Sequence, residues 1–333
     1  MDIPVPFTTL RQVFHVGDIH VRKLQRHDEY RQVFSRLYDK LRNEDIEDSI
    51  IYVGGDIFHN KSLIHSVAQS VLLDLVRNYR SINFIFLSGN HDMSNMVGDG
   101  VSATKSFDNE KNVTTIHETC QIENILFVPW NPRTMIIDLK NGTAEYAISH
   151  LGLNEGVLNS GISLVSDIGL KDLKQYKTVF LGHYHTYQKV GNVEYIGSLI
   201  HLDWNDKNQE KRFIEFNSDT GEERSIPSTG YKKHCEFDLT SENKDEILKT
   251  INQLKSEGHH IKLNKTDGLD TSKIEEEFTV IDKREKDITN RGITSGMSIS
   301  DKLNRFLEIK EIPIEKRDAY RNSALNIIES VSI

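Results

Sequence analysis

Five short apolar segments of the sequence are each followed by residues that can bind a metal ion. The motifs are Gly17-Asp18-Ile19-His20, Gly54-Gly55-Asp56, Gly89-Asn90-His91, His150-Leu151-Gly152 and Gly182-His183-Tyr184-His185. Their candidate ligands are carboxylates, one amide and imidazoles, with no thiolate: Asp18, His20, Asp56, Asn90, His150, His183 and His185. This mixture suits manganese, iron or zinc better than magnesium, which prefers oxygen ligands alone. Because seven ligands are too many for one ion with an open position, they predict two ions about 3.5–4 Å apart that share a carboxylate.

A pair of divalent ions of this kind predicts chemistry at phosphorus. The two ions activate a water molecule and stabilise both oxygens of an in-line displacement. A histidine beside the pair can stabilise the transition state or protonate the leaving oxygen. Each motif alone has a structural explanation, as a helix cap, a turn or a hydrogen-bonded core histidine. The occurrence of all five in order, each at the end of an apolar segment, favours the chemical interpretation.

The apolar segments themselves are predicted to be β-strands. Residues 12–16, 50–53, 84–87, 146–149 and 178–181 are rich in β-branched and aromatic residues, and a glycine lies after or near each of them. Sites in open α/β sheets form at the carboxyl ends of strands, and glycine lets a ligand approach the backbone closely. The five motifs are therefore expected to converge.

Amphipathic helices are predicted between the first three strands. Apolar residues recur at helical spacing in residues 27–43 and 62–80, and Ser62 is a suitable N-cap for the second helix. Alternating strands and helices predict a sheet covered on both faces. Further strands at 113–117, 125–128, 193–196 and 212–216 are predicted to form a second sheet stacked on the first.

The pattern changes after residue 228. Strands are predicted at 235–239 and 260–263 with a helix at 243–256 between them, followed by a charged linker and two amphipathic helices. The expected organisation is a catalytic domain at 1–228, a small α/β module at 229–282, a linker at 283–297 and a helical segment at 298–333.

Composition excludes several protein classes. The 333-residue chain has 27% charged residues, a net charge of −9 and two cysteines. No apolar run approaches the roughly 18 residues of a membrane-spanning helix, and the N-terminus has no secretory signal pattern. We therefore expect a reduced, cytoplasmic protein without a membrane anchor. The acidic balance argues against a general nucleic-acid coat protein but not against a nuclease, because bound metals return positive charge to the site.

Over residues 11–186 the motifs resemble the calcineurin-like metallophosphoesterase superfamily. Within it, the chain resembles the SbcD-type DNA repair nucleases, including the short phage versions that serve recombination. This narrower likeness is carried by Gly55-Asp56-Ile57-Phe58-His59, by the last metal motif followed by Gly197-Ser198, and by the small α/β module with terminal helices. The resemblance implies an α/β fold, namely a β-sandwich flanked by helices in four layers (α/β/β/α).

The resemblance also implies a role for each ligand. Asp18, His20, Asp56 and His185 would hold the first metal; Asp56, Asn90, His150 and His183 would hold the second, with Asp56 as the bridge. His91 would contact the scissile phosphate or act as an acid, and His59 would assist it.

The implied activity is a two-metal DNA nuclease, with Mn²⁺ as the expected metal and Mg²⁺ as an alternative. It would cut double-stranded DNA from 3′ ends and single strands internally. The implied assembly is a homodimer with an SbcC-type coiled-coil ATPase on the terminal helices, and the α/β module would cap the DNA path. The setting would be recombination or double-strand break repair in the cytoplasm, of the host if the source is viral.

Several alternatives stay open. The same site would suit a stand-alone phosphoesterase for nucleotides or other small phosphoesters, or a non-enzymatic scaffold after loss of ligands. Arg22, Lys23 and Arg26 could touch DNA phosphates or lie in a solvated loop. Trp130 and Trp204 could stack on bases or pack within loops. The apolar residues near Leu63 and Val67 could form a dimer surface or lie buried in the monomer.

Overall fold

A computed structural model describes residues 12–23, 25–43, 49–61, 63–158, 165–265, 269–282, 297–310 and 312–331. Ser62 and nearly all of the predicted linker lie outside these residues. The chain divides into two compact units, Met1–His234 and Cys235–Ile333. Each unit is considered by itself.

The first unit contains two six-stranded sheets. The first sheet has the order β12-β11-β1-β2-β3-β4 and the second β5-β6-β7-β8-β10-β9. The strands of the first sheet are β1 (Gln12–Val16), β2 (Ser49–Val53), β3 (Asn83–Leu87), β4 (Val113–Ile116), β11 (Arg212–Asn217) and β12 (Glu223–Pro227). Those of the second are β5 (Cys120–Ile122), β6 (Ile125–Val128), β7 (Tyr146–His150), β8 (Thr178–Gly182), β9 (Gln188–Val190) and β10 (Val193–Tyr195).

The interiors of both sheets are parallel. Strands β1 to β4 pair in parallel, and so do β6, β7, β8 and β10, while the outer pairs β1–β11, β11–β12, β5–β6 and β9–β10 are antiparallel. Within each sheet the strands that carry motifs are thus parallel to one another, and their carboxyl ends meet at one rim.

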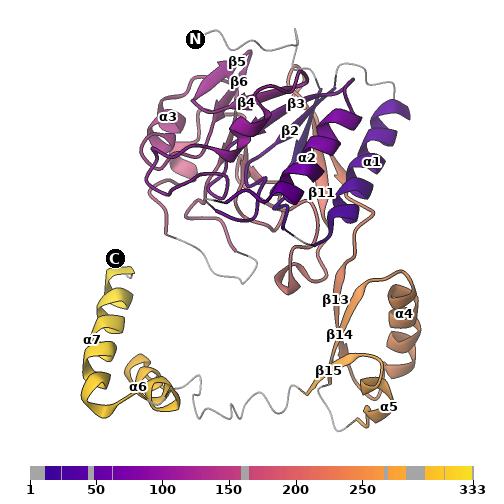
Figure 1. The fold of residues 1–333 in the computed structure, drawn as a ribbon, viewed down its shortest axis with the longest axis vertical. Coiled ribbons are helices and arrows are strands. Elements are labelled where there is room, and N and C mark those ends of the chain that lie inside the picture. Colours follow the sequence, from indigo (N-terminus) through magenta and orange to yellow (C-terminus); the bar gives the residue numbers. More distant parts are fainter. Residues whose placement is uncertain are drawn as a thin grey trace. The chain divides into compact units, whose positions relative to one another are not determined.

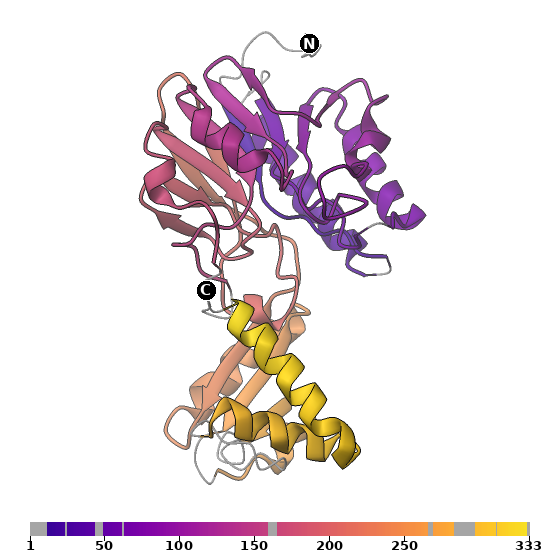
Figure 2. The ribbon, with the colours of Figure 1, turned by 90° about the vertical axis from the view of Figure 1, so that its left-hand side faces the viewer.

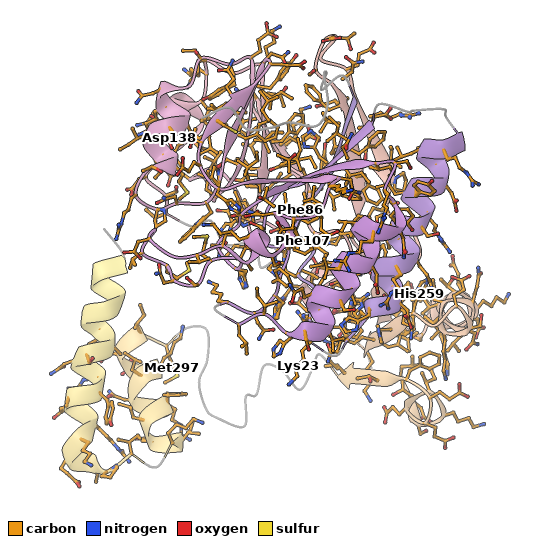
Figure 3. The ribbon with its side chains drawn as sticks, turned by 45° about the horizontal axis from the view of Figure 1, so that its top comes forward. Lys23, Phe86, Phe107, Asp138, His259 and Met297 are labelled. Carbon is orange, nitrogen blue, oxygen red and sulfur yellow. The ribbon has the colours of Figure 1, made fainter. Side chains whose placement is uncertain are left out.

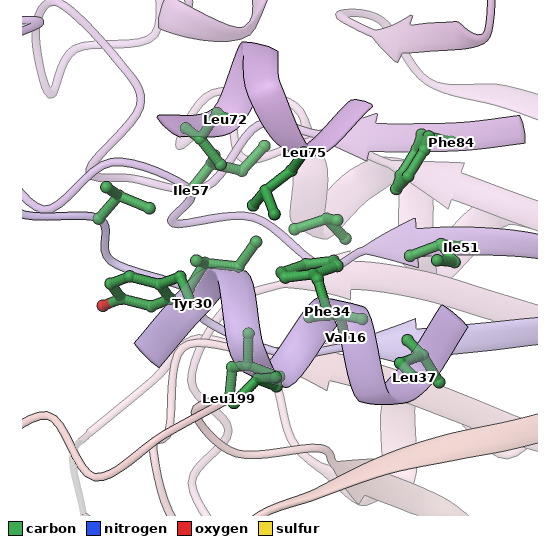
Figure 4. Close-up of a cluster of buried hydrophobic side chains, with 14 of the residues drawn as sticks. Val16, Tyr30, Phe34, Leu37, Ile51, Ile57, Leu72, Leu75, Phe84 and Leu199 are labelled. Carbon is green, nitrogen blue, oxygen red and sulfur yellow. The ribbon is translucent and has the colours of Figure 1, made fainter. Parts of the chain in front are cut away.

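Helices cover the outer faces of the two sheets. Helices α1 (His27–Asn43) and α2 (Ser66–Asn78) lie together on the first sheet, and α3 (Met135–Asn141) lies on the second (Figure 1). Side chains of α1 and α2, including Phe34 and Leu75, point toward Ile51 and Phe84 of the strands (Figure 4). The result is the expected four-layer α/β/β/α sandwich.

Successive side chains of β1 face opposite layers of the sandwich. Phe14 and Val16 pack against the helices, whereas Val13 and His15 face the second sheet. A short 3₁₀ helix, η1 (Ala103–Phe107), closes one corner of the helix-side core, where the rings of Phe86 and Phe107 pack edge to face with centroids 5.1 Å apart (Figure 3).

The assignment of strands to sheets differs from the prediction. Strands β4 and β11 belong to the first sheet, and β7 and β8 belong to the second. Short strands buried on both faces carry no periodic signal that distinguishes one sheet from another. The five motifs consequently come from both sheets, three from the first and two from the second.

The start of α2 also differs from the prediction. The helix begins at Ser66 after the N-cap residue His65, whose backbone is extended. Leu63 and Ile64 precede the helix, and Val67 lies on its outer face; they are 57%, 38% and 46% exposed. The buried face is formed by Ala68, Val71, Leu72, Leu75 and Val76. Leu63, Ile64 and Val67 are therefore not buried within the monomer.

The described residues of the second unit form a three-stranded sheet and four helices. The sheet order is β13-β14-β15, and β14 and β15 are parallel. The strands are β13 (His234–Leu239), β14 (His260–Lys265) and β15 (Thr279–Asp282), and the helices are α4 (Lys244–Ser256), α5 (Ser272–Glu275), α6 (Ile299–Ile309) and α7 (Ile314–Val331). The elements α5 and β15 were not predicted. Helices α6 and α7 contact each other at a steep angle (Figure 2).

Candidate metal centre

The loops that follow β1 and β2 run side by side beyond the ends of the strands. His20 N donates to Asp56 O at 2.9 Å, and Val21 N donates to Ile57 O at 2.9 Å. The bond from Val21 N, together with one from His59 N to Val21 O at 3.2 Å, forms an isolated parallel bridge between Val21 and Phe58. The first and second motifs are thereby fixed against each other.

Three of the candidate ligands have left-handed backbone conformations. The φ angles of His20, Asp56 and His183 are 51°, 50° and 99°. Residues with side chains adopt this region rarely, and such strain concentrates at functional sites. Sharp turns at these positions place the ligand atoms at the rim of the sandwich.

The structure brings all seven predicted ligands together in two groups. In the first group, His20 Nε2 lies 3.1 Å from His185 Nε2, 3.4 Å from Asp56 Oδ2 and 3.9 Å from Asp18 Oδ1. In the second, His150 Nε2 lies 3.2 Å from both Asp56 Oδ1 and Asn90 Oδ1. His183 Nδ1 lies 3.2 Å from the same Asn90 oxygen.

Asp56 belongs to both groups through different oxygens. Its Oδ2 faces His20 of the first group, and its Oδ1 faces His150 of the second. This is the geometry that a carboxylate bridging two cations requires. His91 N also donates to Asp56 Oδ1 at 2.8 Å, which fixes the orientation of the carboxylate.

Surrounding groups orient the ligands. His150 Nδ1 is 2.7 Å from Gly54 O, so Nδ1 carries the proton and Nε2 faces the centre. His183 N donates to both oxygens of Asp18 at 3.1 and 3.2 Å. Lys211 Nζ donates to His185 O at 2.8 Å. Ligands held in this way are pre-organised for a metal ion.

The donor set fits divalent cations. Asp18, Asp56, His20 and His150 are 0–2% exposed, and His20 Nδ1 has no hydrogen-bond partner among the described residues. Among those residues, Asp18, His20 and His185 form one potential metal-binding group and Asp56, His150 and His183 form another, with the ligand atoms of each group within 4.8 Å of one another. Two carboxylates without bulk water favour a compensating cation.

The pKa shifts of Asp18, Asp56 and His150 agree with a site that binds positive charge. Burial raises the pKa of Asp18 to about 7. Burial would also raise the pKa of Asp56, but His150 and His20 more than offset it and hold this pKa well below its usual range. Burial opposes the charged form of His150, yet Asp56 raises its pKa to about 9. A cation bound at this position would replace the proton on His150.

His59 and His91 lie at the more open edge of the centre. The ring of His20 is 4.8 Å from the ring of His91 and 5.5 Å from that of His59, between centroids. His91 Nδ1 is 2.6 Å from His59 O, which fixes the ring of His91. Burial, and then the charge of Arg22, lowers the pKa of His59. Both residues thus lie beside the two ligand groups.

Two supporting residues were missed by the sequence analysis. Asp92, fully buried, accepts from Gly89 N, Phe58 N and Ile57 N at 2.9, 3.0 and 3.2 Å and so connects the second and third motifs. Its position directly after His91 was the only available signal. Lys211, beneath His185, had no signal, because it lies 26 residues further along the chain.

The three basic residues that follow the first motif have different environments. Lys23 is exposed, and Arg22 is close enough to His59 to affect its pKa. Arg26 donates to Glu29, to His201 O and to Lys232 O at 2.8 Å, and its side chain is 16% exposed. These bonds indicate that Arg26 stabilises the fold, whereas the sequence predicted a contact with DNA phosphates.

The fold consists of two stacked sheets flanked by helices, and at its rim Asp56 is shared between the two ligand groups. This combination is typical of a metal-dependent phosphoesterase. A calcineurin-like phosphoesterase model matches residues 11–210. The chain belongs to this calcineurin-like phosphoesterase family, whose members bind two divalent metal ions.

Individual relatives are more distant. The uncharacterized protein R555 of Acanthamoeba polyphaga mimivirus is 27% identical over 313 residues, which cover 75% of this chain and 22% of the relative. Exonuclease subunit 1 of Enterobacteria phage T4 is 27% identical over 192 residues, which cover 52% of this chain and 54% of the relative. The chain thus spans about a fifth and about half of these two relatives. The crystal structure of Pseudomonas putida nuclease MPE aligns over 65% of this chain and 86% of its own, at 14% identity and a TM-score of 0.31.

Helices in the described part of the chain are all too short or too polar to cross a membrane.

Proposed function

We propose that this protein is a two-metal-dependent DNA nuclease. The observation that carries the proposal is the position of Asp56, which offers one oxygen to each of two ligand groups. The similarity to an exonuclease subunit of phage T4 supports DNA as the substrate. The proposed activity is 3′–5′ removal of nucleotides from duplex DNA and internal cutting of single strands, in recombination or repair in the cytoplasm of a host cell.

The proposed ligand assignment follows the two groups. Asp18, His20 and His185 hold one ion, Asn90, His150 and His183 hold the other, and Asp56 bridges them. The mixed nitrogen and oxygen donors favour Mn²⁺. When bound, the two ions supply Lewis-acid stabilisation of the negative charge that grows on the phosphate oxygens.

The protein groups around the ions bind and orient the substrate. His91, whose ring is fixed by His59 O, contacts the scissile phosphate or donates a proton to the leaving oxygen. His59 assists it. Arg22 and Lys23 attract the phosphates of the strand on the same side of the centre.

The test is hydrolysis of labelled duplex and single-stranded DNA with Mn²⁺ by the Asp56→Asn variant. We expect a loss of at least 100-fold, with an unchanged circular dichroism spectrum, because the bridging charge is removed while the shape is kept. The matched control is Asp99→Asn, which changes an exposed carboxylate paired with Arg133. Full activity of Asp56→Asn would refute the two-metal mechanism. Hydrolysis of nucleotides but not of DNA by the unmodified protein would instead favour the stand-alone phosphoesterase.

We further propose that the terminal helices bind an SbcC-type coiled-coil ATPase. Leu307 is buried, but Ile299, Phe306, Ile314 and Tyr320 are 45–78% exposed on the helix pair. Phe306→Glu should abolish co-purification with such an ATPase, whereas Glu308→Gln on the same helix should not. Unchanged assembly of both variants would refute the docking surface.

Two further proposals concern organisation. Residues 1–228 form the nuclease domain, and residues 229–282 form a module that caps the DNA path. Leu63, Ile64 and Val67, which we call the α2 apolar edge, are exposed and support a homodimer contact.

A further inference from the structure

Trp204 differs from the other tryptophan of the chain in its exposure. Trp130 is 8% exposed and packed within its loop, whereas Trp204 is 37% exposed. Trp204 begins the 3₁₀ helix η3 (Trp204–Asp206), and the ring of His234 packs edge-on against it with centroids 4.9 Å apart. Trp204 is therefore an aromatic side chain that reaches solvent from an ordered turn, where an indole face can stack on a ligand.

The turn that carries Trp204 is anchored to a metal ligand. Asp206, which is fully buried, accepts from Lys211 Nζ at 2.7 Å and from Leu202 N at 2.7 Å. The same Lys211 ammonium donates to His185 O at 2.8 Å and to Gln209 Oε1 at 3.1 Å. Each of its three protons therefore has an acceptor, and one buried cation connects the Trp204 turn to the backbone of His185.

A second connection runs parallel to the first. Gln209 Nε2 donates to Asn205 O within the turn and to Thr186 Oγ1, directly after His185, at 3.2 Å each. Asp203, next to Trp204, caps η3 by accepting from Asn205 N at 2.7 Å. These bonds fix the backbone of the Trp204 turn close to His185, a candidate ligand of the first metal group.

We propose that Trp204 is a stacking platform for a nucleobase next to the scissile phosphate. The proposal rests on the nuclease function proposed above and adds a base-binding subsite to it. An indole stacks on any base, so it would position strands without regard to sequence, as a nuclease of general DNA requires. Because the turn is already ordered by buried bonds, little conformational entropy is lost when a base binds.

The chain offers a direct probe, because it contains only two tryptophans. In a Trp130→Phe background, Trp204 is the sole indole fluorophore. Oligothymidylate and an abasic strand with the same number of phosphates are each mixed with the Mn²⁺-loaded protein by stopped flow, and emission is recorded before the strand is cut. We expect oligothymidylate to quench the emission and the abasic strand to leave it unchanged.

Two variants then separate stacking from folding. Trp204→Ala should weaken binding of oligothymidylate about tenfold and leave the affinity for the abasic strand unchanged. Trp204→Phe should recover most of the loss, because phenylalanine keeps an aromatic face. Equal quenching by the two strands, or an equal loss of affinity for both in Trp204→Ala, would overturn the platform.

The result is distinguishable from failure of the nuclease proposal. Normal DNA cutting without base-dependent quenching would refute the platform and leave the nuclease intact. Base-dependent quenching without DNA cutting would refute the nuclease proposal and leave the platform intact.

Discussion

At the scale of single residues, the candidate ligands and the neighbouring histidines differ in position. Asp56 and His150 are buried and contact each other, whereas His91 reaches the centre from the open edge and is fixed through the carbonyl of His59. This position supports the proposed role of His91 as a group that acts on substrate rather than as a metal ligand. The proposed role can be tested by substitution.

The variant His91→Ser should retain bound metal and lose about 100-fold or more in turnover, because general acid catalysis contributes about that much. Metal content is measured by atomic emission and turnover with labelled DNA. His117→Ser, a change in a histidine that pairs with Asp108 outside the centre, is the control and should alter neither. Loss of metal from His91→Ser would show that His91 is a ligand.

His15 lies between the two sheets and links stability to pH. Its ring stacks on Phe180 at 4.3 Å, and neither ring nitrogen has a hydrogen-bond partner among the described residues. Burial lowers the pKa of His15 to about 3 from 6.5. Between pH 6.5 and pH 3, His15 binds a proton in the unfolded chain but not in the folded protein. The contribution of neutral His15 to the free energy of unfolding is therefore complete above pH 6.5 and is lost as the pH falls toward 3.

The variant His15→Phe should remove this dependence. Between pH 7.5 and 5.5, the free energy of unfolding of the unmodified protein should fall by about 1.4 kcal/mol more than that of the variant. Urea denaturation at the two pH values measures the difference, and His117→Phe serves as a surface control. Parallel pH profiles for the unmodified protein and His15→Phe would show that His15 does not stay neutral in the fold.

At the scale of elements, the strand ends and their glycines decide how closely the motifs approach. A Cβ atom on Gly89 would lie 2.3 Å from both Asp56 N and Asp56 Oδ1, whereas one on Gly54 would meet its nearest atom at 3.6 Å. Only glycine at position 89 therefore lets the third motif lie this close to Asp56.

Gly89→Ala should displace Asp56 and lower metal affinity at least tenfold, and Gly54→Ala, in the neighbouring loop, should leave it within twofold. Isothermal titration with Mn²⁺ compares the two. Equal affinities would show that the loops relax independently of the carboxylate.

At the scale of the whole molecule, exposed apolar residues mark the surfaces available for assembly. The α2 apolar edge projects from the first unit, and the second unit carries exposed apolar side chains on α6 and α7. Clusters of this kind are characteristic of interfaces.

The variant Val67→Glu should convert a dimer into a monomer, because a charge would be buried at the contact. Light scattering with size-exclusion chromatography reports the mass. Gln32→Glu, which adds the same charge on exposed α1, should remain dimeric. A dimer that persists in Val67→Glu would exclude the α2 apolar edge as the contact.

The sequence by itself determined most of the strands and the family. Helix α1 and strands β1 and β6 have the bounds that their patterns predicted, because apolar periodicity is a local property. The family was also evident, since five ligand motifs in order leave little room for another chemistry. The homologous exonuclease subunit is consistent with the nuclease interpretation of these motifs.

Only the tertiary structure decided how distant segments combine. The sheet that holds β7 and β8, the position of both oxygens of Asp56, and the bond from Lys211 to the backbone of His185 depend on contacts between residues far apart in the chain. The true start of α2 likewise followed from packing, since Leu63 and Ile64 fit a helical pattern but have no core to cover. Local patterns specify which face of an element is apolar, whereas the partner of that face is fixed by the fold as a whole.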